Sequence, residues 1–189
     1  MKKLLLAATA ACLGLAGVAS AATTFNFQFD ASGGGGAAGT VAPPIVGTGT
    51  FISPVDLGVG QYALSSLVGF SLQFTFGSDT FSTTDIATPI DGVAILISQD
   101  GALERLVFTE TGIAGSDGGP FGGSLDLVNA ASNALTFQPS GGSLYFEFVG
   151  GGASFGNYLA LSESVPEPMS LALLSTGLCG LGLLRRRRA

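Results

Sequence analysis

The sequence predicts an all-β body, folded as an antiparallel β-sandwich of the jelly-roll or immunoglobulin-like kind, between an N-terminal signal helix and a single C-terminal transmembrane helix. Three observations of the body predict its fold. Apolar and polar residues alternate with a period of two, glycine-rich turns separate the alternating segments, and helical periodicity is almost absent. About ten short strands at spacings of roughly 8–12 residues are typical of such sandwiches.

The first element, residues 1–21, is predicted to be a signal peptide. Lys2 and Lys3 precede an apolar run over residues 4–18, and Ala19-Ser20-Ala21 has the small-x-small form of a signal-peptidase site. We therefore expect signal peptidase to recognise Ala19 and Ala21 and to cleave after Ala21. The alternative is an uncleaved membrane helix, which the short run and the good cleavage site disfavour.

Residues 22–164 form the predicted sandwich body. In the clearest strands, apolar side chains face one way and polar side chains the other, which predicts one buried and one exposed face. The run Val93–Ile97 is apolar on both faces and predicts a central, covered strand. The predicted alternating strands are 25–29, 70–76 and 144–148, and further short strands are expected over 103–111, 125–128 and 135–138.

Turns and core residues of the body follow from its composition. Glycine-rich segments separate the strands, and Asp100-Gly101 between two apolar runs is the best candidate for a tight hairpin. All 14 Phe lie in the body, whereas Cys12 and Cys179 lie in the terminal apolar runs. A phenylalanine-rich core, with no disulfide, must therefore stabilise the body.

The last element, residues 165–189, is predicted to be a membrane tail. Residues 169–184 are free of charge, and a helix of that length spans about 24 Å, slightly less than a hydrocarbon core of about 30 Å. The tail ends in a basic cluster that should stay cytoplasmic, which leaves the body on the exported side. This cluster consists of Arg185, Arg186, Arg187 and Arg188.

This tail resembles the PEP-CTERM sorting signal of exported bacterial proteins, a sequence that is also catalogued as an ice-binding-protein C-terminal domain. The resemblance rests on Val165-Pro166-Glu167-Pro168, the following span rich in Leu and Gly, and the arginine cluster. It implies that a membrane-embedded exosortase recognises Pro166, Glu167 and Pro168 and processes the chain nearby during sorting to the cell surface or the extracellular polymer matrix. The alternative is that Pro-Glu-Pro is only a stiff juncture before an anchor.

The charge distribution excludes several functions. Residues 22–164 contain 12 acidic residues and one basic residue, Arg105, so their net charge is 1 − 12 = −11. They contain no His, Lys or Cys, which excludes a Ser-His triad, a Cys nucleophile, a Lys Schiff base and a zinc site of His and Cys. A body this acidic is expected to bind no nucleic acid.

Carboxylates and tyrosines are the remaining candidates for chemistry in the body. Glu104, Glu110 and Glu147 are the acids that a glycan hydrolase would need as a facing pair. Tyr145 and Tyr158 are the candidates for a sugar platform, and the alternation of its strand places Tyr145 opposite Phe146 and Phe148. Structural calcium is a further candidate, at Asp91-Gly92, Asp100-Gly101 and Asp117-Gly118.

We therefore expect an exported, non-enzymatic surface or extracellular-matrix protein that is transiently anchored in the inner membrane. Its expected partners are signal peptidase, an exosortase-type enzyme, the membrane and extracellular polysaccharide, and no catalytic residue, resident metal or other cofactor is assigned. The first alternative is a carbohydrate- or calcium-binding adhesive module of the same architecture. The second is a carboxylate-based glycan hydrolase. The threonines show no sustained repeat of the kind expected for a flat ice-binding array.

Overall fold

The structure is a computed structural model that describes residues 22–32, 40–112, 120–140, 143–150 and 154–163. These residues form eleven strands and three 3-10 helices, and no helix among them is long and apolar enough to cross a membrane. The predicted signal helix over 1–21 and transmembrane helix over 169–184 lie outside the described residues.

Every strand pairing in the described residues is antiparallel, so the predicted antiparallel all-β class is confirmed. The strands are β1 (Thr23–Asp30), β2 (Ile45–Ser53), β3 (Gly60–Ala63), β4 (Ser71–Phe76), β5 (Asp79–Ser82), β6 (Val93–Asp100), β7 (Leu103–Glu110), β8 (Leu125–Val128), β9 (Ala134–Ser140), β10 (Ser143–Val149) and β11 (Ser154–Ser162). The 3-10 helices are η1 (Leu64–Ser66), η2 (Thr83–Asp85) and η3 (Ile90–Gly92).

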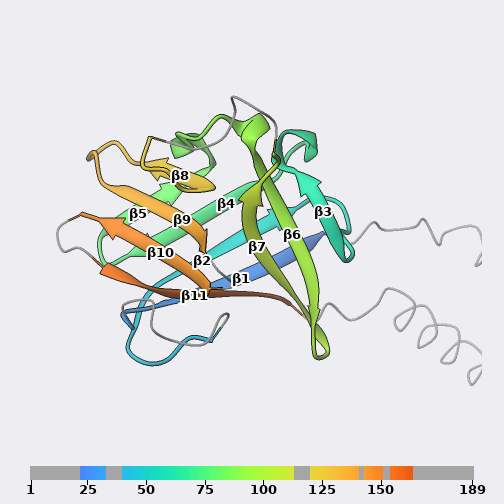
Figure 1. The fold of residues 1–189 in the computed structure, drawn as a ribbon, viewed down its shortest axis with the longest axis horizontal. Helices are drawn as coiled ribbons and strands as arrows, with labels where there is room; N and C mark the ends of the chain where they lie inside the picture. The colour runs from blue at the N-terminus through green and yellow to red at the C-terminus, as the bar shows by residue number, and fades with distance from the viewer. Residues whose placement is uncertain (1–21, 33–39, 113–119, 141–142, 151–153, 164–189) are drawn as a thin grey trace, which may run out of the picture. The chain divides into compact units, whose positions relative to one another are not determined.

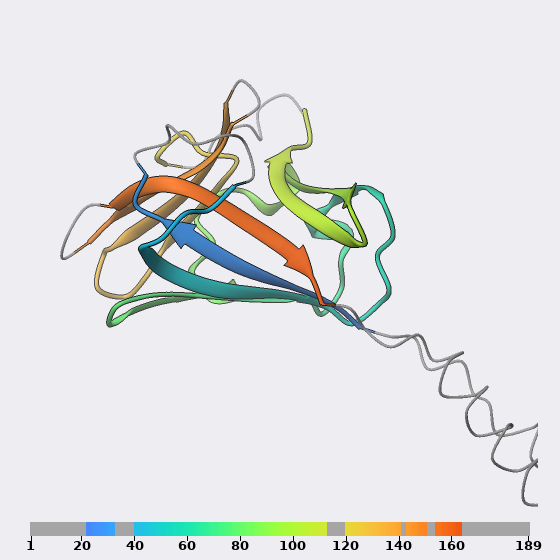
Figure 2. The ribbon, with the colours of Figure 1, turned by 90° about the horizontal axis from the view of Figure 1, so that it is seen from below.

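The strands form one curled sheet in the order β3-β6-β7-β11-β1-β2-β4-β5, from which β10, β9 and β8 branch at β11 (Figure 1). Strand β11 makes this branch because its two halves have different partners. Residues 154–157 pair with β10, whereas residues 158–162 pair with β1. In Figure 2, β1 lies between this part of β11 and β2. The two ends of the curled sheet meet just after β5, where Ile86 forms an isolated bridge with Leu127 of β8.

Phenylalanine rings from several strands meet at the centre of the curl. The Phe27 ring of β1 lies 5.1 Å from Phe74 of β4, 5.8 Å from Phe108 of β7 and 6.1 Å from Tyr158 of β11, measured between centroids. All four side chains are buried. The inward face of the period-two pattern therefore forms the predicted core, and the stacking of Phe108 on Phe27 packs β7 against β1.

Two hairpins with two-residue loops follow glycine turn chemistry. Asp100 pairs with Leu103, so the loop is Gly101-Ala102, with Gly101 at φ 63°. A positive φ at the first of two loop residues is the pattern of a type II′ turn, which favours glycine. Gly77, at φ 58°, has the same place in the β4–β5 hairpin. The predicted hairpin at Asp100-Gly101 is thus confirmed, with Asp100 as its last paired residue.

Two expectations about the strands need correction. Val93–Ile97 was predicted to be covered on both faces, but Leu96 is 43% exposed. The run is central because β6 pairs with both β3 and β7, and its outward face is only partly covered. Strands β2, β3, β5 and β11 were not predicted. In β2, Gly47 and Gly49 give a sequence that resembles a turn, although both lie within paired strand.

Candidate functional site

The outward faces of four neighbouring strands carry two rows of amide and hydroxyl side chains. In each strand two polar residues flank one inward residue, and the cross-strand register aligns the four pairs. We call these eight residues the polar array. The first row is Asn26, Thr50, Gln73 and Ser82, and the second row is Gln28, Thr48, Thr75 and Thr80.

An open groove of about 410 Å³ runs over the part of the polar array that β1, β2 and β4 contribute. Among the described residues that line it, none has an ionisable side chain. The lining residues are Asn26, Phe27, Gln28, Thr48, Gly49, Thr50, Gln73 and Thr75. The groove therefore presents donors and acceptors of hydrogen bonds without a net charge.

Most polar side chains of the groove are free to bind a ligand. Within the described part of the chain, Gln28, Thr48, Thr50, Gln73 and Thr75 make no side-chain hydrogen bond. Asn26 differs, because its amide donates to Oε1 of Glu163 at 2.9 Å. Ser82 and Thr80 lie beyond the groove on β5, where the Ser82 hydroxyl donates to Asp85. The free donors and acceptors are thus concentrated on β1, β2 and β4.

Glycine in β2 shapes the sheet beneath this groove. A Cβ on Gly49 would overlap the ring of Phe74 and lie 2.6 Å from the backbone oxygen of Gln73. The phenylalanine ring of β4 therefore fills the inward position that a side chain at residue 49 would take. Strand β2 can then present Thr48 and Thr50 outward while its neighbour supplies the core.

Tyr145 and Tyr158, the predicted sugar-platform candidates, have different environments. Tyr145 points away from the buried Phe146 and Phe148, as predicted, and its hydroxyl donates to Oε1 of Gln138 at 2.7 Å. Its ring lies 5.2 Å from Phe155, which is 41% exposed. Tyr158 is fully buried in the core, and this burial raises its pKa above the usual range. Tyr145 alone of the two can meet a surface ligand.

The predicted acids of β7 do not form a facing pair. Glu104 and Glu110 lie at opposite ends of the strand, six residues and therefore about 20 Å apart. Glycosidase carboxylates lie about 5–9.5 Å apart. Glu147 lies on the outward face of β10, in the other branch of the sheet.

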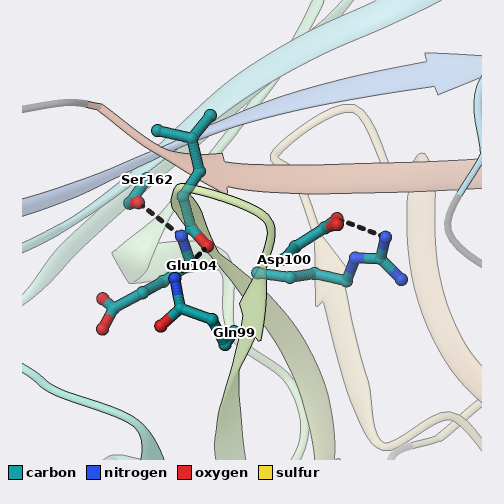
Figure 3. A network of polar contacts seen from close by, with 6 residues as sticks. Gln99, Asp100, Glu104 and Ser162 are labelled. Carbon is teal, nitrogen blue, oxygen red and sulfur yellow. Dashed lines mark hydrogen bonds and ion pairs between the residues drawn. The ribbon is translucent and has the colours of Figure 1, made fainter.

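A network of polar contacts instead joins the β6–β7 hairpin to β11 (Figure 3). The backbone N–H of Glu104 donates to Oγ of Ser162 at 2.8 Å, and Arg105 forms an ion pair with Asp100. Within the hairpin, Gln99 donates to the backbone oxygen of Leu103 at 3.1 Å. The bond between Glu104 and Ser162 holds the hairpin against the end of β11, and the other two contacts lie within the hairpin.

A buried carboxylate that the sequence analysis missed stabilises the point where β11 changes its partner from β10 to β1. Asp30 accepts hydrogen bonds from Ser32, from the N–H of Ala42 at 3.0 Å and from the N–H of Asn157 at 2.8 Å. Burial raises the pKa of Asp30, but these hydrogen bonds lower it more, so it lies below the ordinary value of 3.8. The group has a structural role, and only the turn-forming Asp30-Ala31-Ser32 in the sequence pointed to it.

Two of the three calcium candidates have partners within the described residues. Asp100 is paired with Arg105, the backbone oxygen of Asp91 accepts from the Thr111 hydroxyl at 2.9 Å, and Asp117 lies outside the described ranges. In the described part of the chain, no group of three or more His, Cys, Asp or Glu is placed to hold a metal ion.

The predicted signal-peptidase and sorting residues lie outside the described residues, whereas the body is described from residue 22 to residue 163 apart from its internal gaps. Phe25 pairs with Ser162, and the N–H of Glu163 donates to the oxygen of Thr24 at 2.9 Å. The start of β1 and the end of β11 are therefore neighbours. The residues in question are Ala19, Ala21, Pro166, Glu167, Pro168, Arg185, Arg186, Arg187 and Arg188.

Comparison with known proteins adds no relative: no family model, no curated protein and no solved structure matches this chain.

Proposed function

We propose that the protein is an exported, non-enzymatic surface or matrix protein whose body binds extracellular polysaccharide through the polar array. The observation that carries this proposal is the groove, with five side chains that have no hydrogen-bond partner among the described residues. Amides and hydroxyls both donate and accept, which suits the hydroxyl groups of sugars. Well-placed polar groups fix the orientation and specificity of a bound ligand, and the groove offers five such side chains.

The location of the protein rests on the sequence. Signal peptidase would remove residues 1–21, and an exosortase-type enzyme would process the chain near Pro166-Glu167-Pro168. The Arg185–Arg188 cluster would hold the tail in the inner membrane until then. Because β1 begins beside the end of β11, both predicted address segments attach to one end of the body. The polar array would remain on the exported side, where polysaccharide is present.

The finer architecture is also part of the proposal. We assign the body to the β-sandwich class, with β3, β6 and β7 as part of a second layer over β1, β2 and β4. The stacking of Phe108 on Phe27 and its edge contact with Phe74 at 6.5 Å support this assignment.

A binding assay with paired variants tests the role of the polar array. The full chain in detergent is run through native gels that contain hydroxyethylcellulose or dextran, and its retardation is measured. Thr48→Val with Thr75→Val should weaken binding about tenfold, because two hydrogen bonds to the ligand are lost. Thr109→Val on β7, outside the polar array, is the matched control. Equal retardation of the wild type and the double variant would reject the polar array as the site.

Cell fractionation tests the predicted address. Replacing Arg185–Arg188 with Ser should impair anchoring or sorting, since the positive cluster sets the orientation of the tail. Mass spectrometry of surface material should find chains that end near Pro166. Intact peptides across 166–188 as the dominant form would contradict the processing step.

A further inference from the structure

We infer that the polar array binds a neutral polysaccharide along an internal stretch of its chain and excludes acidic polysaccharides. This inference rests on the proposed function and specifies its ligand. Three features support it: the charge of the body sequence, the hydrogen-bonding lining of the groove and the direction in which the lining extends.

Electrostatics disfavour an acidic ligand. Residues 22–164 have a net charge of −11, and the groove itself has no ionisable lining residue. Arg105, the one cation of those residues, is paired with Asp100 on the β6–β7 hairpin. Glu163 adds a carboxylate at the Asn26 end of the groove. A uronate or sulfate group would lose hydration there without a compensating cation and would be repelled by the surrounding acids.

The lining is suited to hydroxyl groups. Gln28 and Gln73 each provide donors and acceptors, and Thr48, Thr50 and Thr75 provide hydroxyls that can do either. Phe27 is almost fully buried and its ring packs in the core on the inward face, so it offers no stacking platform to a ligand in the groove. Recognition would therefore come from many neutral hydrogen bonds, each of them weak on its own. A long ligand with repeated hydroxyl groups can make enough of them.

The direction of the rows indicates how the ligand lies. The two rows cross β1, β2 and β4, a distance of about 10 Å, and continue onto β5 for about 14 Å in all. On the other side of β1, Asn26 pairs with Leu161 and Gln28 with Leu159, which are half-buried and uncharged. With these leucines the two rows span five strands, and the carboxylates of Glu163 and Asp85 lie beside Asn26 and Ser82 at the ends of the first row. A polymer lying across the strands would be contacted along its length and would not need a chain end.

The test uses two polymers with one backbone and different charge. The full chain in detergent is run through gels containing neutral hydroxyethylcellulose or anionic carboxymethylcellulose, and through a second pair, dextran and dextran sulfate, at low and high salt. We expect retardation by a neutral polymer at both salt concentrations and none by its anionic counterpart at low salt. Mono- and disaccharides should compete at least tenfold more weakly, per sugar unit, than the polymer, because they cover less of the length of each row.

Charge variants make the test specific to the groove. Gln73→Lys should allow binding of the anionic polymer at low salt, and Gln73→Glu should reduce binding of the neutral one. Gln61→Lys and Gln61→Glu on β3, at an exposed position outside the polar array, are the matched controls and should change neither. Thermal unfolding of each variant verifies that it is folded.

The outcomes separate the two proposals. If the wild type prefers the anionic polymers and Gln73→Glu weakens that binding, the neutral ligand is wrong while the polysaccharide-binding function stands. If no polymer is bound, or if all groove variants bind as the wild type does, the proposed function fails and this inference fails with it. If the chain instead inhibits ice recrystallisation through Thr48 and Thr75 and binds no polymer, the rows serve a flat crystalline ligand and both proposals are rejected.

Discussion

The inward and outward faces of β1, β2 and β4 have opposite chemistry although their residues alternate along the same strands. Inward, Phe27 and Phe74 lie in a ring cluster with centroid distances as short as 4.8 Å elsewhere in the same core. Outward, Gln28, Thr48 and Thr75 have no side-chain partner within the described residues. One face therefore determines stability, and the other is available for binding at little cost to the fold.

The largest effect on stability is expected for Phe27→Ala. The Phe27 ring contacts rings from four other strands, so its removal leaves a cavity that several elements border. Such truncations cost about 3–5 kcal/mol. Chemical denaturation of wild type and variant measures the difference. A loss below about 1 kcal/mol would show that the core does not converge on this ring.

A large and pH-dependent effect is expected for Asp30→Ala. The variant leaves the N–H groups of Ala42 and Asn157 without their acceptor, at about 1–3 kcal/mol for each group that finds no water. The pKa of Asp30 is lowered in the folded state, so its carboxylate contributes stability that is fully present above the ordinary value of 3.8 and is lost as the pH falls through the lower folded value.

Unfolding free energies of wild type and Asp30→Ala should therefore converge as the pH falls below about 3.8. Asp56→Ala is a suitable control, because Asp56 is exposed and its carboxylate accepts one side-chain hydrogen bond among the described residues, from Thr23. A difference between wild type and Asp30→Ala that stays constant from neutral to acid pH would contradict the assignment of that stability to the ionised carboxylate.

The sequence predicted which side chains of a strand face inward and which face outward, but it did not predict which strands lie side by side. Alternation in 25–29 and 70–76 correctly assigned Phe27 and Phe74 inward and Gln28 and Gln73 outward. The polar array exists because β3 pairs with β6 at the far edge of the sheet and not with β2, which leaves β4 directly beside β2. Strand order depends on tertiary packing, which the period of two does not encode.

The polar contacts between residues far apart in the chain could not be predicted from the sequence either. Asp30 and Asn157 are 127 residues apart in the chain, and β11 was not predicted as a strand because Gly156 and Asn157 are typical of turns. A Cβ on Gly156 would meet the side chain of Asp30 at 2.6 Å. Gly156 is therefore explained by its close packing against Asp30 and not by a turn.

An intermediate effect is expected where the two faces meet, at Gly49. Alanine at this position would overlap the Phe74 ring and approach the backbone of Gln73, so β2 or β4 must shift. Overpacking of this kind costs about 1–3 kcal/mol. Gly58→Ala, where nothing lies within 4 Å of the added Cβ, is the matched control and should change the melting temperature little. Equal melting temperatures for both variants would show that the Phe74 ring does not fill the inward position at residue 49.

The smallest effect on stability is expected for Thr48→Val with Thr75→Val, and it distinguishes the two faces most directly. Valine keeps the β-branched shape, and these hydroxyls have no partner to lose among the described residues, so the free energy of unfolding should change by less than about 0.5 kcal/mol. Thr88→Val is the contrast, because the buried Thr88 hydroxyl accepts from the N–H of Asp126 at 2.7 Å and its loss should cost about 1–3 kcal/mol. If the double variant were as destabilised as Thr88→Val, the hydroxyls of Thr48 and Thr75 would stabilise the folded protein. The claim that they are unpaired and available to a ligand would then be wrong.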